Sequence, residues 1–379
     1  MKTLIKTIIM ALLLMGSALA CKLSNSINSF SFKLLNASLN GKNLNLSPYS
    51  IYIAFSPVYE GAENNTEKEL KLGFLYHSKI ELRKLLKAEI TEKKENIKLY
   101  NGIYIQKGFY IRQNYLKAVK NFYKPEISSV DFTTKDGRKK TIYRINSNVK
   151  NTTEGKIKDL IKQTDITPLT RLIIVNAIHF KDRWKMPFKK ELTATKPFHS
   201  VNGTVKVPTM ETTGRFAIFE NKTVKAVSLP YENGYKMLIF LPKKGNFKLT
   251  YNTYKNIIRK MKPTFIKIEM PKFTTENRIY LKSTLSKLGV KDVFTMKANL
   301  SRITGKKNLY VQKAIHQTFI HVDENGTEAA AATAVAIGLK SIPPKRKKLF
   351  KIDRPFFFTL TDKKGIILFT GYIVNPLEE

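Results

Sequence analysis

The sequence predicts an α+β protein that folds as one domain. One observation supports the class, and a second supports the single domain. Helical patterns are concentrated in the first 161 residues, whereas short apolar or alternating segments, typical of β-strands, dominate the rest. No internal repeat and no linker rich in Pro, Gly or Ser divides the 379 residues, although the length alone would also allow two domains.

The N-terminus has the composition of a secretory signal peptide. Lys2 and Lys6 precede an apolar run, and an A-x-A cleavage pattern ends at Ala20. The run is too short to anchor the chain stably in a bilayer. We therefore predict a signal peptide at 1–20, one mature domain at 21–379, and a secreted, periplasmic or extracellular location.

The single cysteine, Cys21, directly follows the predicted cleavage point. A lipid anchor on Cys21 is the alternative interpretation, but Ala18 stands where a leucine is usual before an acylated cysteine. Because one cysteine cannot form a disulfide within the chain, stability must come from the hydrophobic core.

The formal net charge of +38 favours polyanions, acidic surfaces and negatively charged partners. A general richness in Lys and Asn is the competing explanation of this charge. Nothing in the sequence specifies a nucleic acid as the partner.

The helical patterns are found mainly before residue 161. Ile27–Leu39 is amphipathic, and the segment 45–50 is a short strand that enters a helix for which Ser47 or Ser50 is the N-cap. Further helical segments are 67–75, 80–94, 115–123, two stretches within 140–161, and 281–288, which ends at Gly289.

The strand patterns are found mainly in the second half. Arg171–Phe180 is too continuously apolar for a half-exposed strand and is therefore a central one. Further predicted strands are 97–106, 125–132, 198–210, 226–231, 235–242, 266–273, 309–322 and 366–376.

The most unusual stretch runs from Asp323 to Ser341. From Thr327 to Leu339 it contains one charged residue, Glu328, in a protein with 25% charged residues. A run of alanines by itself favours a helix, but a solvated helix of this length normally has a charged face. At a period of two, the face that begins with Thr327 is uncharged, so this segment could enter a sheet as a strand without burying an ion on that face.

The end of this stretch cannot continue a helix, because Ser341-Ile342-Pro343-Pro344 contains two prolines. The basic run 345–348 follows, and the chain returns to the core at 354–358. A nearly uncharged segment that ends in an extended stretch is a good substrate for a protease.

The sequence here resembles the serpin family. The residues that carry the resemblance are those of its reactive-loop hinge: Glu324, Gly326, Thr327, Ala329, Ala330, Ala331 and Ala332. The family spacing implies a scissile bond between Lys340 and Ser341, within a reactive-centre loop at about 324–344. The resemblance also implies the serpin fold, with three mainly antiparallel sheets, about eight or nine helices and an exposed loop.

Other positions match the family in order along the chain. Ser47, Ser50, Asn176 and His316 match a polar cluster beneath the main sheet, where the sheet must part. Trp184, the only tryptophan, matches a position at the top of that sheet, and Lys272 matches the partner of Glu324 in an ion pair at the hinge.

The helical segment 80–94 carries Arg83, Lys84 and Lys87, of which the first and third share a face at helical spacing. Some serpins bind polyanions near this helix, so a site for a polyanion such as a sulfated glycan is one interpretation. An ordinary solvated face is the other.

The sequence lacks the motifs of common enzymes, including G-x-S-x-G, H-E-x-x-H and glycine-rich phosphate loops, and its five histidines have no metal-ligand spacing. We expect no enzymatic activity, cofactor or metal. The resemblance implies a monomeric suicide inhibitor that a trypsin-like serine protease acylates at Lys340 and that traps the protease by loop insertion. The alternatives are a non-inhibitory serpin that acts as a carrier or chaperone, and an inhibitor of cysteine proteases.

Overall fold

The computed structural model of the protein describes residues 21–92, 94–245, 247–328 and 348–378. Residues 21–38 are helical. The other α-helices in the described part of the chain are α2 (Pro48–Gly61), α3 (Asn64–Phe74), α4 (Lys79–Thr91), α5 (Gln113–Phe122), α6 (Lys135–Thr152), α7 (Tyr251–Lys260), α8 (Leu281–Lys287) and α9 (Ser301–Thr304). No helix among these residues is long and apolar enough to cross a bilayer.

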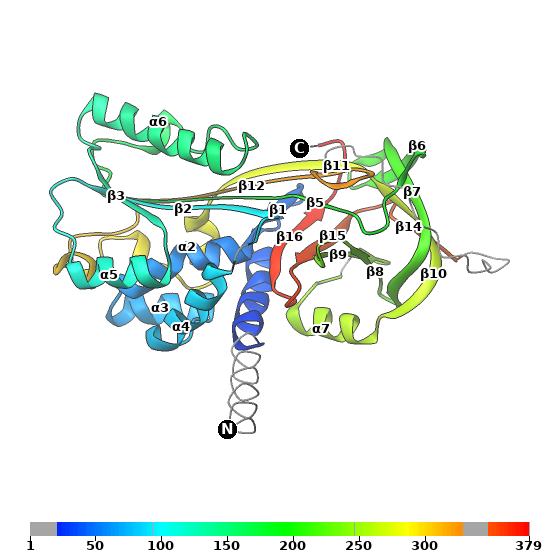
Figure 1. The fold of residues 1–379 in the computed structure, drawn as a ribbon, viewed down its shortest axis with the longest axis horizontal. Helices are drawn as coiled ribbons and strands as arrows, with labels where there is room; N and C mark the ends of the chain where they lie inside the picture. The colour runs from blue at the N-terminus through cyan, green and yellow to red at the C-terminus, as the bar shows by residue number, and fades with distance from the viewer. Residues whose placement is uncertain (1–20, 93, 246, 329–347, 379) are drawn as a thin grey trace, which may run out of the picture.

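One sheet runs through the helical half of the molecule. Its strands are ordered β3-β2-β4-β12-β13-β5, with β11 paired to β12. Their bounds are β2 (Ile97–Gln106), β3 (Glu126–Val130), β4 (Leu172–Phe180), β5 (Asp182–Arg183), β11 (Phe273–Tyr280), β12 (Lys313–Val322) and β13 (Gly326–Thr327). Figure 1 shows α6 on one face of this sheet and α2 to α5 on the other.

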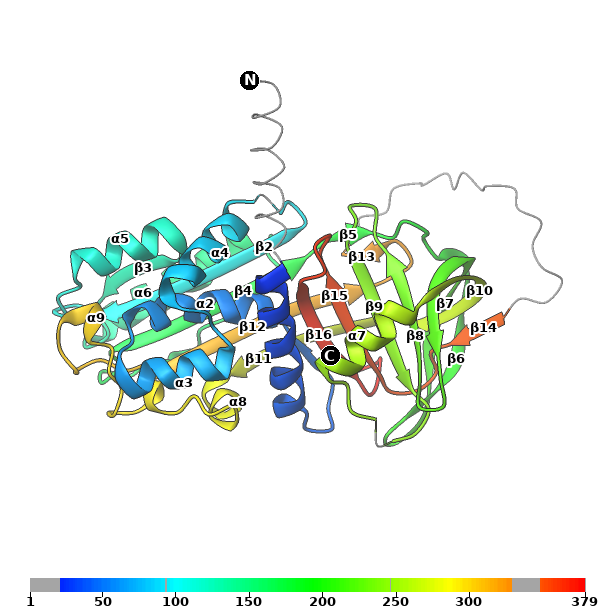
Figure 2. The same ribbon diagram turned by 90° about the horizontal axis from the view of Figure 1, so that it is seen from below.

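The remaining strands form the β-rich half, in the order β1-β16-β15-β9-β8-β7-β10-β14 with β6 paired to β7. Their bounds are β1 (Leu44–Leu46), β6 (Lys189–Ser200), β7 (Gly203–Glu220), β8 (Val224–Pro230), β9 (Lys236–Pro242), β10 (Lys262–Pro271), β14 (Lys348–Lys351), β15 (Phe356–Thr361) and β16 (Ile367–Ile373). Figure 2 shows α7 packed beside these strands. The long β7 pairs with β6 through its first half and with β8 through its second. Two of the three sheets that the resemblance implied are therefore joined into one sheet.

The α+β class is confirmed, and the strand predicted as central, β4, pairs with β2 on one side and β12 on the other. It is buried along its whole length because apolar side chains pack against both of its faces. Two local predictions were wrong. The second helical stretch within 140–161 is absent: α6 ends at Thr152, and Glu154 and Gly155 have positive φ angles of 53° and 80° that turn the chain. The segment 198–210 is the end of β6, a turn at 201–202 and the start of β7.

The hydrophobic core has two parts. The larger part lies between the two sheets and helices α2 to α5. The smaller part lies between α6 and the outer face of the first sheet, where Ile145 and Val149 of the helix pack on strand residues such as Val175 and Ile315. The side chains of Ile157, Leu160 and Ile161 fill this second core from a non-helical segment, which explains why their apolar spacing was misread as a helix.

Candidate functional site

The centre of the first sheet contains a parallel pair of strands, β4 and β12. Their register runs from Ile173 opposite Lys313 to His179 opposite Phe319. The outer partners, β2 on β4 and β11 on β12, are both antiparallel. A strand that entered between β4 and β12 and ran antiparallel to both would replace a parallel ladder by two antiparallel ones, which are slightly more stable per residue. We call the β4–β12 contact the seam.

A buried polar cluster lies beneath the seam and contains Ser47, Ser50, Asn176 and His316, which the resemblance placed there. The backbone N–H of Ser47 donates to Nε2 of His316 at 3.1 Å, and Nδ1 of His316 is 2.5 Å from Oδ1 of Asn176. Since Nε2 accepts, the proton of the neutral ring is on Nδ1 and donates to Asn176. The single imidazole therefore connects β12, β4 and the start of α2.

The serines of this cluster also shape α2. Oγ of Ser47 accepts from the N–H of Ser50 at 3.2 Å as the N-cap, and donates to the carbonyl of Leu368 at 2.6 Å. Oγ of Ser50 donates to Oδ1 of Asn176 at 2.8 Å. A member that sequence reasoning missed is Asn101 on β2, whose Oδ1 accepts from Nδ2 of Asn176 at 2.6 Å.

Burial lowers the pKa of His316 to about 3, because the fully enclosed ring cannot hydrate a positive charge. The ring is therefore neutral at ordinary pH, as its acceptor role toward Ser47 requires.

Trp184 lies at the top of the seam, next to the turn that leads into the hinge. Its indole stacks on Tyr231 with ring centroids 4.2 Å apart, and its Nε1–H donates to the carbonyl of Asp323 at 2.9 Å. Its backbone N–H donates to the carbonyl of Asn325 at 2.9 Å. The tryptophan thus holds the hinge turn by both its side chain and its backbone.

The Glu324 carboxylate is held by two neighbours. Nζ of Lys272 is 2.9 Å from Oε2, and Oγ1 of Thr193 donates to Oε1 at 2.8 Å. Burial would raise the pKa of Glu324, but these hydrogen bonds outweigh it and lower the pKa below its usual value. The ion pair with Lys272 is the one that the resemblance implied, and Thr193 is an addition that no local pattern in β6 could reveal.

Gly326 and Thr327 form β13, a two-residue strand wedged between the top of β12 and β5. Thr327 pairs with Val322 on one side and Asp182 on the other, and Gly326 pairs with Arg183. A Cβ atom on Gly326 would be 2.1 Å from the carbonyl oxygen of Asp182, so only glycine fits. The Thr327 side chain is fully buried, and its Oγ1 is 2.6 Å from the hydroxyl of Tyr231.

Glu328 directly follows β13. Its φ is +54°, a left-handed conformation, and its side chain lies on the α6 side, opposite to Thr327. Its carboxylate is 2.5 Å from Nζ of Lys156 and 3.9 Å from Nε2 of His179. Burial lowers the pKa of His179 to about 4, so the ion pair is with Lys156. Neither Lys156 nor His179 was predicted, because only the fold brings them to the hinge.

The three basic residues of α4 do not form one free patch. Arg83 makes a bidentate ion pair with the buried Glu60, with Nε–Oε2 at 2.9 Å and Nη2–Oε1 at 2.5 Å. Lys84 is exposed, and Lys87 lies 5.7 Å from the centroid of the Phe122 ring. The guanidinium of Arg83 is therefore committed to the interior of the protein, and two lysines remain at the surface.

Several predicted residues lie outside the described residues: the signal peptide 1–20, Ala329 to Ala332, and the Lys340–Ser341 bond. Cys21, at the start of the described chain, is exposed. Within the described residues, no three side chains of His, Cys, Asp or Glu are gathered as metal ligands would be.

The sequence profile of the family described as Serpin (serine protease inhibitor) matches residues 25–376. The chain belongs to the serpin family. An uncharacterized serpin-like protein of Thermococcus kodakarensis is 38% identical over 93% of this chain and 85% of the relative. The leukocyte elastase inhibitor of Homo sapiens is 32% identical over 88% of this chain and 93% of the relative.

Solved serpin structures superpose closely on this one. The thermophilic serpin tengpin in its native state has a TM-score of 0.84 at 27% identity, covering 93% of this chain and 94% of that one. Human thyroxine-binding globulin complexed with thyroxine has a TM-score of 0.85 at 27% identity, covering 95% of this chain and 100% of that one. Serpins are generally protease inhibitors rather than enzymes, but the second structure is of a protein named for binding thyroxine.

Proposed function

We propose that this serpin is a secreted suicide inhibitor of a trypsin-like serine protease. The observation that carries the proposal is the position of β13. The first residues of the hinge are already paired between β12 and β5, directly above a parallel seam that an antiparallel strand can enter.

The chemistry begins at Lys340, whose ammonium fits the carboxylate at the base of a trypsin-like specificity pocket. The protease serine attacks the carbonyl carbon of Lys340, the bond to the nitrogen of Ser341 breaks, and the new amine takes the proton from the catalytic histidine. The products are an acyl-enzyme and a free loop end. The loop up to Lys340 then inserts into the seam.

The hinge residues suit this insertion. From Glu328 to Lys340 about 13 residues, at about 3.3 Å each, would carry the acyl bond about 40 Å along the sheet. Thr327 and the four alanines are small, and on the inward face no charge would be buried. The uncleaved fold would be metastable, since the new ladders form only after cleavage.

The test is incubation with trypsin followed by denaturing gel electrophoresis. We expect a covalent complex of protease and serpin, and a released C-terminal peptide that mass spectrometry shows to begin at Ser341. Cleavage without a complex would instead favour a non-inhibitory carrier or chaperone, the function class to which thyroxine-binding globulin belongs by name.

The reacting bond is tested by Lys340→Ala, with Leu339 as the competing position for a chymotrypsin-like protease. Loss of the ammonium from a desolvated pocket costs several kcal/mol, or about a thousandfold in rate. Lys340→Ala should abolish inhibition of trypsin and leave any inhibition of chymotrypsin through Leu339 intact. A peptide that begins at Lys340 with every protease would contradict the assignment.

A further inference from the structure

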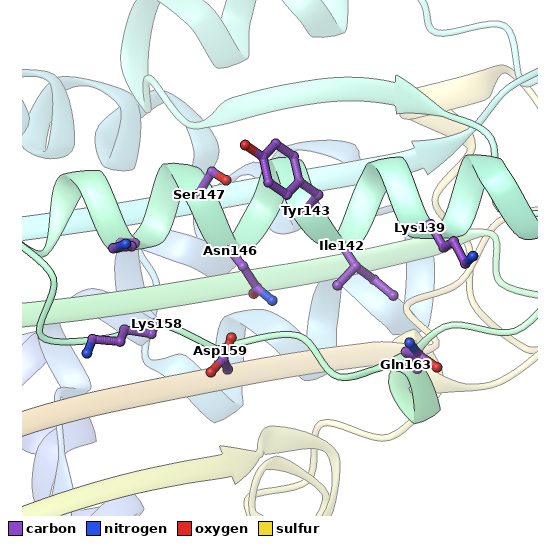
Figure 3. Close-up of a pocket in the computed structure, with 9 residues that line it drawn as sticks. Lys139, Ile142, Tyr143, Asn146, Ser147, Lys158, Asp159 and Gln163 are labelled. Carbon is purple, nitrogen blue, oxygen red and sulfur yellow. The ribbon is translucent and has the colours of Figure 1, made fainter.

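A groove of about 500 Å³ lies between α6 and the segment that follows it. We call it the α6 groove. It is lined by Lys139, Ile142, Tyr143, Asn146, Ser147, Lys150, Lys158, Asp159 and Gln163. Figure 3 shows the helix forming one wall and the segment with Lys158, Asp159 and Gln163 forming the other.

The helical wall is a continuous stripe, since its six residues recur at intervals of three and four. Lys139 and Lys150 stand at its two ends, 11 residues and therefore about 16 Å apart along the axis. Asn146 fixes the distance between the walls, because its side chain exchanges two hydrogen bonds of 2.9 Å with the backbone of Ile161. The groove is thus built from packed elements rather than from mobile side chains.

The charge of the groove is positive and uncompensated. Lys139, Lys150 and Lys158 are exposed, and no carboxylate lies within ion-pair distance of them in the part of the chain that the structure describes. Asp159 is the only acidic residue of the lining. By contrast, Lys98, Arg144 and Lys156 around the same helix are each paired with a glutamate.

The groove also carries features that suit sugars. Tyr143 leaves 77% of its surface exposed, an unusual position for a large aromatic side chain. Ser147 and Gln163 add neutral donors and acceptors to the lining. Single-stranded nucleic acids are usually bound on several aromatic platforms along a groove, and here there is one.

We propose that the α6 groove binds an anionic polysaccharide, with the three lysines contacting its acidic groups and Tyr143 stacking on a sugar ring. The groove is open and elongated, so a polymer can lie along it and extend beyond both ends. The α4 surface is a weaker candidate, because Arg83 is already bound to Glu60.

The experiment is titration calorimetry of the mature chain with low-molecular-mass dextran sulfate, with neutral dextran as the blank and no protease present. The triple variant Lys139→Ser/Lys150→Ser/Lys158→Ser should bind about tenfold more weakly, because three exposed charge contacts are lost. The slope of the logarithm of the binding constant against the logarithm of the salt concentration should become shallower by about two to three units, because fewer counterions are released. Inhibition of trypsin is a separate measurement, so failure of one proposal leaves the other testable.

The matched control removes the same charge elsewhere. Lys222, Lys244 and Lys248 are exposed lysines in turns of the β-rich half. Their triple change to Ser should leave the affinity for dextran sulfate within about twofold of the original. Equal losses in the two triple variants would mean binding by overall charge and would overturn the site.

Two single changes separate sugar recognition from charge. Tyr143→Ala should weaken binding at constant charge while Tyr143→Phe preserves it, and Asp159→Asn should strengthen binding. Both positions are exposed, so these variants should remain folded. If Tyr143→Ala has no effect, or if an oligo(dT) probe binds the groove as tightly as dextran sulfate, the assignment to a polysaccharide is wrong.

Discussion

The polar cluster beneath the seam should make the stability of the native state depend on pH through His316. The perturbation is acidification from about pH 7.5 to about pH 5.5. Burial lowers the pKa of His316 to about 3 and that of His179 to about 4, from an unfolded value of 6.5. Below about pH 6.5 the unfolded chain therefore binds protons that the folded chain does not. The contribution of these neutral histidines to the unfolding free energy is fully present above that pH. It is lost as the pH falls toward their pKa values in the folded state.

The magnitude follows from this difference. Over those two pH units, one histidine that stays neutral in the fold costs about 1.4 kcal/mol of unfolding free energy, and two cost about 3 kcal/mol. A paired carboxylate such as Glu324 begins to lose its stabilising effect only as the pH falls to its unfolded pKa of 4.5, and its lowered folded pKa extends that loss to still lower pH. The interval thus reports mainly on the imidazoles.

The assay is urea unfolding followed by the fluorescence of Trp184, the only tryptophan, which is stacked on Tyr231 at the top of the seam. In His316→Gln the fall in unfolding free energy over the interval should be about half that of the original protein. His199→Gln, at an exposed position, is the matched control and should keep the full fall. An unchanged fall in a folded His316→Gln variant would refute the buried neutral imidazole.

The other predictions concern the hinge. Thr327→Arg would place a charge in the fully buried position beside Tyr231, at a cost of several kcal/mol unless the charge is paired. We expect this variant to be a substrate that trypsin cleaves without forming a covalent complex. An undiminished amount of complex on the gel would rule out the assignment of Thr327 to the inward face. Gly326→Ala should lower the unfolding free energy by about 1–3 kcal/mol, because the new Cβ meets the backbone of Asp182 at 2.1 Å; an unchanged urea midpoint would show that β13 is not wedged there. Cleavage within the loop should raise the unfolding temperature in scanning calorimetry, and equal midpoints for intact and cleaved protein would favour the non-inhibitory alternative.

Much of the architecture could be predicted from local patterns. The buried β4, the strand β2 and the Ser47 cap each follow from a short run of residues whose period or type has one structural meaning. The error at 198–210 was avoidable, because Asn202-Gly203 is a strong hairpin signal and Gly203 has a φ of +126° there.

The contacts of the hinge could be predicted only in part. The resemblance pairs Lys272 with Glu324, whereas the hinge contacts Thr193 and Lys156, and Asn101 of the polar cluster, were missed. These three are polar residues on strands or turns with nothing unusual in their neighbours. Their roles arise from contacts between residues far apart in the sequence, for which a single sequence has no local signal.

The two-residue strand β13 also has a kinetic consequence. For a free loop, finding the seam would require closing a long chain segment, with an entropy cost that grows with its length. Here the first pair of residues is already docked between β12 and β5, so the proposed insertion would proceed by propagation from a formed nucleus, one residue after another. The partition between insertion and hydrolysis of the acyl bond would then depend on how fast β4 and β12 separate along their seven register pairs, from Ile173–Lys313 to His179–Phe319. It would not depend on how fast a free loop finds the seam.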